Sequence, residues 1–325
     1  MINFPYILGS DGQSFTFSDN GYFRYPKQVT IPANVKTLSG NTAAFRQHIE
    51  IENIAFETGS QLLTIGTYAF SGCTGLKSIV FPANRNLVLN ASAFNGDDAL
   101  ETVTFPDCIV NIGNAAYAFA ECIKLSQSSF EALMEQATGT AIQGQTFYNC
   151  QGITSLTVPD TVIQIMAYAF SGCSALSSVN LNNVTTLQIG AFINCTSLPE
   201  VNLKNVTSLQ GSIFAGNTAL KKVTFERTPT TAPYMAASNN NNMFYGCTAL
   251  EDVVLPNGWN INMVLSDGSA TFTNVLTHDS MVAMIANLYD YIGGTSHTLT
   301  LGATNLARLS AEEIAVATAK NWTLA

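Results

Sequence analysis

The pattern that decides the fold is LTIGTYAFSGCTGLKSIVFP, residues 63–82, because its spacing returns along most of the chain. Its central residue, Phe70, is one of nine phenylalanines that recur at intervals of 22 to 30 residues. They are Phe45, Phe70, Phe94, Phe119, Phe147, Phe170, Phe192, Phe214 and Phe244. Self-similarity with such a period is typical of a solenoid, in which each repeat buries its apolar face against its neighbours.

Further residues keep a fixed distance from each phenylalanine. Six positions after it stands Leu or Ile in every repeat, as at Leu76. Nine and eleven positions after it lies an apolar pair such as Ile79 and Phe81, the period-2 pattern of a strand with two inward side chains. Pro82 or its equivalent often follows and ends the strand, because proline cannot donate to a ladder. Stacked repeats are therefore predicted to form parallel β-ladders spaced by about 4.8 Å.

This pattern resembles the BspA-like leucine-rich repeats of bacterial and protist surface proteins. The matching segments include residues 65–73, 165–173 and 189–195, and the resemblance covers about residues 29–256. It implies a curved, right-handed leucine-rich repeat solenoid, an α/β fold of about nine repeats built on parallel β-ladders. It also implies a role in adhesion or recognition without enzymatic activity.

Two repeats depart from the pattern. After Phe119, residues 128–137 have helical apolar spacing, and Ser128 with Glu131 is predicted to form a capping box. After Phe214, residues 229–242 are predicted to form a surface loop.

Both ends of the chain are predicted to be caps, which a solenoid needs. Residues 14–17 and 22–25 flank Ser-Asp-Asn-Gly and predict an N-terminal β-hairpin cap, and residues 29–32 predict the strand of a partial first repeat. The C-terminal α/β cap is predicted to have helices over 279–292 and from Ser310 to about Lys320, with strands at 299–301 and 321–324. The predicted domains are 1–28, 29–256 and 257–325.

The composition of the chain disfavours two classes of partner, nucleic acids and anionic membranes. Charged residues make up only 11% of the chain, the net charge is −9, and no Lys/Arg cluster occurs, which disfavours nucleic acid and anionic membranes. No apolar run approaches the roughly 20 residues needed to span a bilayer, so membrane insertion is not expected. Residues 1–6 lack the features of a secretory signal. Either the sequence begins at a trimmed mature start or the native protein is not secreted.

Six of the seven cysteines stand three positions after a recurring phenylalanine, in a column that His48, Asp97 and Asn217 also occupy. We interpret them as buried free thiols, because parallel Cβ vectors oppose disulfides and a linear column does not converge on zinc. Cys108 lies outside the column and could be exposed. No metal site, cofactor or catalytic residue is predicted.

The histidines have structural interpretations that are preferred over catalysis. His48 is predicted to pack or fill the end of its column. His278 precedes Asp279, which is predicted to cap the helix that follows. His297 lies in a Gly-Gly-Thr-Ser-His turn, with no partner visible in the sequence.

The best functional candidates are outward strand positions, eight and ten residues after each phenylalanine. These positions predict two exposed polar columns on one sheet face, suited to hydrogen bonding with a protein or a glycan; the alternative is a merely solvated face. Tyr234, in the loop after Phe214, adds an exposed aromatic side chain. The candidate ligand-binding residues are Thr104, Thr157, Asn180, Glu200, Asn202, Thr224 and Tyr234.

Three functions follow as hypotheses. The first is a non-enzymatic cell-surface or secreted binding or adhesion protein with a protein or glycan ligand. The second is a prophage tail-associated structural or receptor-binding protein of a phage particle, because residues 299–309 resemble a terminal module of some bacterial surface and prophage tail-associated proteins. The third is an enzyme, which no catalytic motif in the sequence supports.

Overall fold

The structure is a computed structural model that describes residues 6–8, 14–17, 27–38, 45–83, 86–105, 110–230, 242–265 and 275–325. The chain divides into two compact units, unit 1 (Met1–Thr154) and unit 2 (Ser155–Ala325). Each unit is a stack of the predicted repeats, which confirms the leucine-rich repeat solenoid class. The predicted domain borders after residues 28 and 256 stay predictions.

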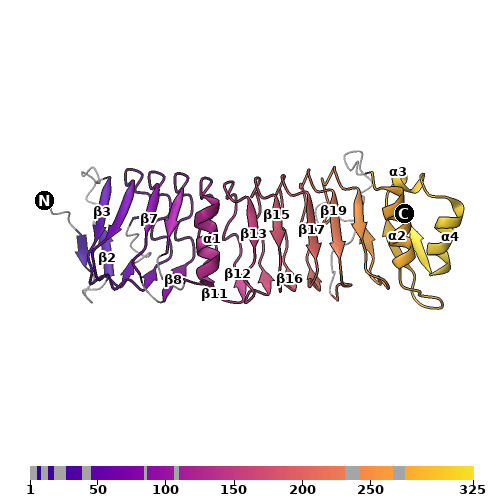
Figure 1. The fold of residues 1–325 in the computed structure, drawn as a ribbon, viewed down its shortest axis with the longest axis horizontal. Coiled ribbons are helices and arrows are strands. Elements are labelled where there is room, and N and C mark those ends of the chain that lie inside the picture. The colour runs from indigo at the N-terminus through magenta and orange to yellow at the C-terminus, as the bar shows by residue number, and fades with distance from the viewer. Residues whose placement is uncertain are drawn as a thin grey trace. The chain divides into compact units, whose positions relative to one another are not determined.

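Unit 1 contains two ladders and one helix (Figure 1). The sheet that carries the outward polar positions has the order β3-β5-β7-β9, and its neighbouring strands are parallel. The second sheet has the order β1-β2-β4-β6-β8-β10-β11. The elements are β1 (Tyr6–Leu8), β2 (Ser14–Phe17), β3 (Gln28–Ile31), β4 (Thr37–Leu38), β5 (Asn53–Phe56), β6 (Thr64–Ile65), β7 (Ser78–Val80), β8 (Leu87–Asn90), β9 (Thr102–Thr104), β10 (Val110–Asn114), α1 (Gln127–Gln136), β11 (Ala137–Thr138) and β12 (Ala141–Ile142).

Unit 2 continues the repeat pattern and ends in helices and strands. The parallel pairs β13–β15, β17–β19 and β19–β20 carry its outward polar positions, and β14-β16-β18 form the second ladder. The elements are β13 (Ser155–Thr157), β14 (Gln164–Ile165), β15 (Ser178–Asn180), β16 (Thr186–Leu187), β17 (Glu200–Leu203), β18 (Ser208–Leu209), β19 (Lys222–Phe225), β20 (Asp252–Val254), β21 (Met263–Val264), α2 (His278–Asn287), β22 (His297–Thr300), α3 (Ala303–Leu306), α4 (Ala311–Ala319) and β23 (Trp322–Leu324).

The recurring phenylalanines form a stacked core in each unit. In unit 1 the rings of Phe70 and Phe94 stack with centroids 5.0 Å apart, and those of Phe94 and Phe119 with centroids 5.1 Å apart. In unit 2 the Phe170 and Phe192 rings stack at 5.5 Å. All nine phenylalanines are buried, as are the Leu or Ile residues six positions after them. The predicted aromatic and leucine columns are therefore confirmed within each unit.

The corner after each phenylalanine needs a left-handed backbone, which the sequence analysis did not predict. The residue two positions after it has a positive φ in every repeat, whether it is glycine, as at Gly72 (φ 76°), or not, as at Glu121 (φ 61°). Glycine adopts this conformation without the Cβ penalty that other residues incur. This requirement explains the glycine in the Ser-Gly-Cys segments of the repeat.

Glu121→Gly is expected to stabilise unit 1 by roughly 0.5–1 kcal/mol, because removal of the left-handed penalty outweighs the entropic cost of glycine. The matched control is Glu135→Gly, which places glycine on the exposed face of α1 and should destabilise by about 1 kcal/mol. Denaturant midpoints of both variants check the expectation. Destabilisation by Glu121→Gly would contradict it.

The helix predicted after Phe119 is confirmed as α1, with Phe130, Leu133 and Met134 buried. Its predicted capping box is wrong. The N-cap is Ser126, whose hydroxyl accepts from the Ser129 N–H. Glu131 instead accepts from the Gln127 side chain at 2.7 Å, and the helix starts two residues earlier than a Ser128 cap would allow.

The predicted C-terminal elements are confirmed in type, with corrected ends. Thr277, not Asp279, caps α2, because its hydroxyl accepts from the Ser280 N–H at 3.2 Å. The helix ends at Asn287 rather than 292, since the Asn287 carbonyl accepts from Trp259 N–H and Leu288 is bridged to Trp259. The capping box at Ser310 is confirmed.

At the N-terminus, the antiparallel partner of Ser14–Phe17 is Tyr6–Leu8. The predicted partner, residues 22–25, lies outside the described residues, as do most of the loop after Phe214 and both Tyr234 and Cys108.

Candidate binding site on the strand face

The predicted polar columns exist in unit 2 and are held in register by the ladders. Thr157 lies opposite Asn180, and Asn202 lies opposite Thr224. The residues before them in each strand pair in the same way, so that Glu200 lies opposite Lys222. Thr157, Asn180, Glu200 and Asn202 are exposed, whereas Thr224 is half-buried. In unit 1, Thr104 of β9 is half-buried and lies opposite Val80 of β7.

An interruption of the ladder in unit 2 coincides with Pro199. In the next repeat, the residue at this position is Lys221, whose N–H donates to the Pro199 carbonyl at 2.8 Å. Pro199 has no N–H to donate in the same way to its own preceding repeat. The strands of this face accordingly form the separate groups β13-β15 and β17-β19-β20.

A hollow of about 300 Å³ lies at this interruption. Its lining includes Pro199 and three of the predicted ligand residues, Glu200, Asn202 and Thr224. Val179, predicted as a fully inward strand residue, also lines the hollow and is only half-buried. The repeat spacing predicts the polar columns at this place but not the depression. The signal in the sequence for the depression is Pro199, which has no N–H for strand pairing.

Two polar side chains of the hollow, Lys222 and Asn202, are held by carboxylates of the following repeat or strand end. Lys222 Nζ lies 2.8 Å from Asp252 Oδ2, and the pKa of Lys222 is raised by its hydrogen bond with Asp252 and then by attraction to the same carboxylate. Asn202 Nδ2 donates to Glu226 Oε1 at 2.8 Å. The site therefore offers oriented amide, hydroxyl and carboxylate groups, which suit hydrogen bonding rather than nucleophilic chemistry.

A second, larger hollow lies on the strand face of unit 1, where it is lined by residues of β3, β5 and β7. None of the seven candidate ligand-binding residues lies in this hollow, although Gln28, Asn53 and Ser78 line it. Those residues lie opposite one another along the ladder, Gln28 with Asn53 and Asn53 with Ser78. The eight-residue offset from Phe45 already identifies Asn53.

The six described cysteines are free and buried, as predicted. Five of these thiols donate to phenylalanine carbonyls of the preceding repeat, as Cys122 Sγ does to the Phe94 carbonyl at 3.1 Å. Burial raises the pKa of Cys247 to about 12, so its thiol stays protonated at neutral pH. No group of three or more His, Cys, Asp or Glu side chains suited to a metal ion occurs among the described residues.

The polar members of the cysteine column bond to the backbone instead. Asp97 Oδ1 accepts from the Cys73 N–H at 2.8 Å, and Asn217 Oδ1 accepts from the Cys195 N–H at the same distance. Both residues are fully buried. Burial raises the pKa of Asp97 well above its ordinary value.

The histidines lie apart from both hollows. His48 is half-buried in its column. His278 Nε2 lies 3.0 Å from Glu313 and so links α2 to α4. His297 has a partner that the sequence did not reveal, because its ring stacks on Tyr291 with centroids 4.0 Å apart.

Comparisons with known proteins give one family. A sequence family described as BspA type leucine rich repeat region matches in 6 copies, over residues 14–126 and 115–243. No curated protein matches the chain. Among the described residues, no helix is both long and apolar enough to cross a membrane. Repeat proteins of this family act in protein interaction and are typically non-enzymatic.

Several solved bacterial structures are similar to the chain. A leucine-rich repeat protein from Bacteroides ovatus is 20% identical, with 78% of this chain and 76% of that chain covered and a TM-score of 0.48. A leucine rich repeat protein from T. pallidum is 23% identical over 60% of this chain and 88% of that chain, with a TM-score of 0.45. A leucine rich cell surface protein from Faecalibacterium prausnitzii is 18% identical over 77% and 92%, respectively, with a TM-score of 0.34. On the family match, which spans most of its length, the chain belongs to the BspA type leucine rich repeat family.

Proposed function

We propose that this protein is a cell-surface or secreted, non-enzymatic binding or adhesion protein that recognises a protein or glycan ligand through its strand face. The observation that carries the proposal is the hollow at Pro199, where the ladder interruption brings Glu200, Asn202 and Thr224 to one depression. Neutral amides and hydroxyls next to paired charges can form directed hydrogen bonds with a ligand. The family match supports binding rather than catalysis.

The alternative of a prophage tail-associated protein stays a prediction. The family match ends at residue 243 and so does not bear on residues 299–309, on which that alternative rests. No finding about the described residues favours it over a surface protein.

The double variant Asn180→Ala/Asn202→Ala is expected to weaken ligand binding by about 5-fold to about 150-fold, because two lost hydrogen bonds are together worth roughly 1–3 kcal/mol. The measurement is binding of the purified full chain to panels of extracellular matrix proteins, host cells and immobilised glycans, followed by titration of the strongest ligand. The matched control is Asn183→Ala, an exposed asparagine outside both the hollow and the two polar columns. Unchanged binding of the double variant to every ligand would contradict the proposed site.

A further inference from the structure

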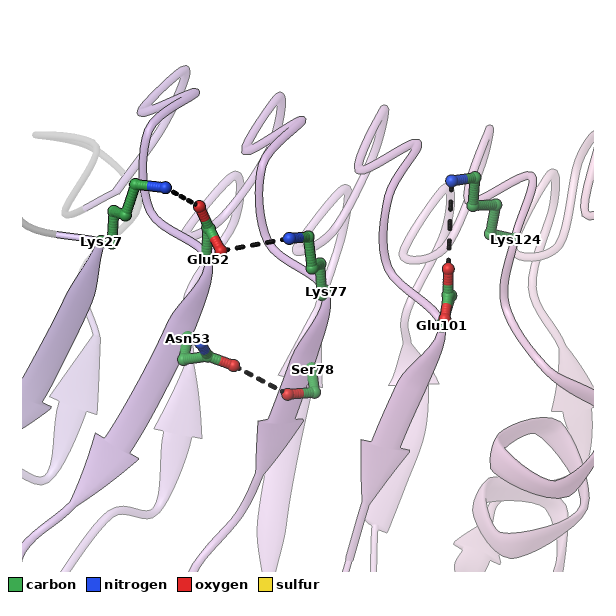
Figure 2. Close-up of polar contacts among 7 residues, drawn as sticks. All are labelled: Lys27, Glu52, Asn53, Lys77, Ser78, Glu101 and Lys124. Atoms are coloured by element: carbon green, nitrogen blue, oxygen red, sulfur yellow. Dashed lines mark hydrogen bonds and ion pairs between the residues drawn. The ribbon is translucent and has the colours of Figure 1, made fainter.

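The strand face of unit 1 carries a groove of about 660 Å³, within the roughly 300–1,000 Å³ typical of ligand pockets. Three polar, uncharged side chains line it at equivalent positions of successive strands: Gln28, Asn53 and Ser78. Asn53 Oδ1 accepts from the Ser78 hydroxyl at 3.0 Å, which fixes the orientation of the amide (Figure 2). The groove thus presents an ordered row of hydrogen-bonding groups.

The same groove has an apolar part. Phe56, Val80 and Pro82 contribute to its lining, and Val80 is 54% exposed although it is a large aliphatic side chain. A ligand seated here would contact apolar carbon surface and amide or hydroxyl groups together. Pockets that combine apolar walls with a few placed polar groups are typical of small-molecule recognition.

The two lysines beside the groove are paired with one carboxylate, that of Glu52. Figure 2 shows Lys27 and Lys77 on either side of Glu52, with Nζ–Oε distances of 2.5 and 3.1 Å. These hydrogen bonds, followed by the attraction of the two lysines, lower the pKa of Glu52. Glu57 is the charged residue of the described lining, and its Oε2 accepts from the Ala33 N–H at 3.0 Å. The exposed carboxylate of Glu57 disfavours an anionic ligand, and the two lysines beside the groove are held by Glu52.

The geometry disfavours a peptide or a protein surface as the occupant. β5 and β7 are each paired on both sides, so they offer no open edge for β-strand addition. Stable protein interfaces bury about 800 Å² per partner over a broad surface. The described lining is instead a concave hollow of about 660 Å³, a volume typical of small-ligand pockets.

We propose that this groove binds a neutral oligosaccharide. A sugar ring has an apolar C–H face, which suits Val80 and Pro82, and a rim of hydroxyls, which suits Gln28, Asn53 and Ser78. The proposal rests on the proposed function as a binding protein. It assigns a ligand class to a second site, separate from the hollow at Pro199.

The test uses the full chain and a defined panel of hexasaccharides: cello-, malto-, xylo- and manno-oligosaccharides, with heparin-derived and sialylated oligosaccharides as charged comparisons. Isothermal titration is expected to detect at least one neutral hexasaccharide and to give an affinity that changes less than about twofold up to about 0.5 M salt, since no ion pairs form. Absence of binding to every neutral member would overturn the proposal. Preferential, salt-sensitive binding of the charged members would also overturn it.

Two variants locate the binding. Asn53→Ala/Ser78→Ala is expected to weaken the titrated hexasaccharide at least tenfold, and Val80→Lys should abolish binding by placing a long charged side chain in the groove. The matched control, Asn183→Ala, lies outside both hollows and should leave this affinity unchanged. If Asn180→Ala/Asn202→Ala lost oligosaccharide binding while the two groove variants kept it, the groove assignment would fail while the proposed function stood. If Val80→Lys lost binding to a protein ligand but kept its binding to every oligosaccharide, the assignment of an oligosaccharide to this groove would be wrong.

Discussion

Phe94→Ala is expected to lower the free energy of unfolding of unit 1 by about 3–5 kcal/mol. The Phe94 ring is fully buried between the rings of Phe70 and Phe119, and Phe81 meets it edge-on at 6.1 Å. Truncation removes the transfer free energy of the ring and leaves a cavity between neighbours that backbone ladders hold in place. The loss is a large share of the stability of an ordinary domain.

Denaturant unfolding followed by circular dichroism measures this loss, and hydrogen exchange locates it. The backbone amides of the repeats on either side of Phe94 should lose protection first, because each repeat contacts only its neighbours. Val80→Ala is the control, an exposed position in the same unit that should stay within about 0.5 kcal/mol of the parent protein. If Phe94→Ala lowered the free energy of unfolding by less than about 1 kcal/mol, the neighbouring rings would have moved into the cavity and the expectation would be wrong.

Asp97→Asn is the second large effect, and its size depends on pH. The Asp97 carboxyl is buried, Oδ1 accepts from the Cys73 N–H, and Oδ2 has no partner among the described residues. Burial, and to a smaller extent the nearby Asp98, raises the pKa of Asp97 above its ordinary value of 3.8. Asn217 occupies the equivalent position in unit 2 and makes the same bond as a neutral amide.

The parent protein should therefore lose stability relative to Asp97→Asn as the pH rises. Below pH 3.8 the carboxyl is protonated in the folded and the unfolded chain, so it adds no pH dependence. Above that value the unfolded chain releases the proton while the folded chain holds it, and the difference grows by up to about 1.4 kcal/mol per pH unit until the folded pKa is reached. At neutral pH the variant should therefore compare more favourably with the parent protein than it does below pH 3.8.

Urea unfolding of both proteins from about pH 4 to about pH 8 measures this difference. Asn217→Asp is the reciprocal control, because it should introduce the same pH dependence into unit 2. Parallel stability curves for the parent protein and Asp97→Asn would contradict the assignment of a proton to the buried carboxyl.

Much of the candidate site could be predicted because it follows from period-2 alternation. Once Phe170 and Phe192 fix the repeat, counting eight and ten residues onward places Asn180, Glu200 and Asn202 on the outside of strands. The hollow could not be predicted in this way. It arises where one missing N–H, at Pro199, interrupts pairing between strands, and that effect exists only once the strands are adjacent.

The helix α1 also has one feature that the sequence predicts and one that depends on tertiary contacts. The apolar spacing of Phe130, Leu133 and Met134 was enough to predict α1. The choice of Ser126 over Ser128 as its cap depended on packing, since the Ser129 hydroxyl also bonds to β9 through the Val103 N–H. Local sequence offers several serines, and contacts with a neighbouring strand select one of them.

The sequence by itself determined the repeat, the buried phenylalanine and leucine columns, the placement of the cysteines beside them and the alternation that turns polar residues outward. These features depend on spacing along one chain, which burial of apolar surface enforces in every repeat. Only the tertiary structure decided the left-handed corners, the burial of the Asp97 carboxyl and the two hollows. Each of these depends on atoms of the neighbouring repeat, whose distance and hydrogen bonds no single repeat encodes.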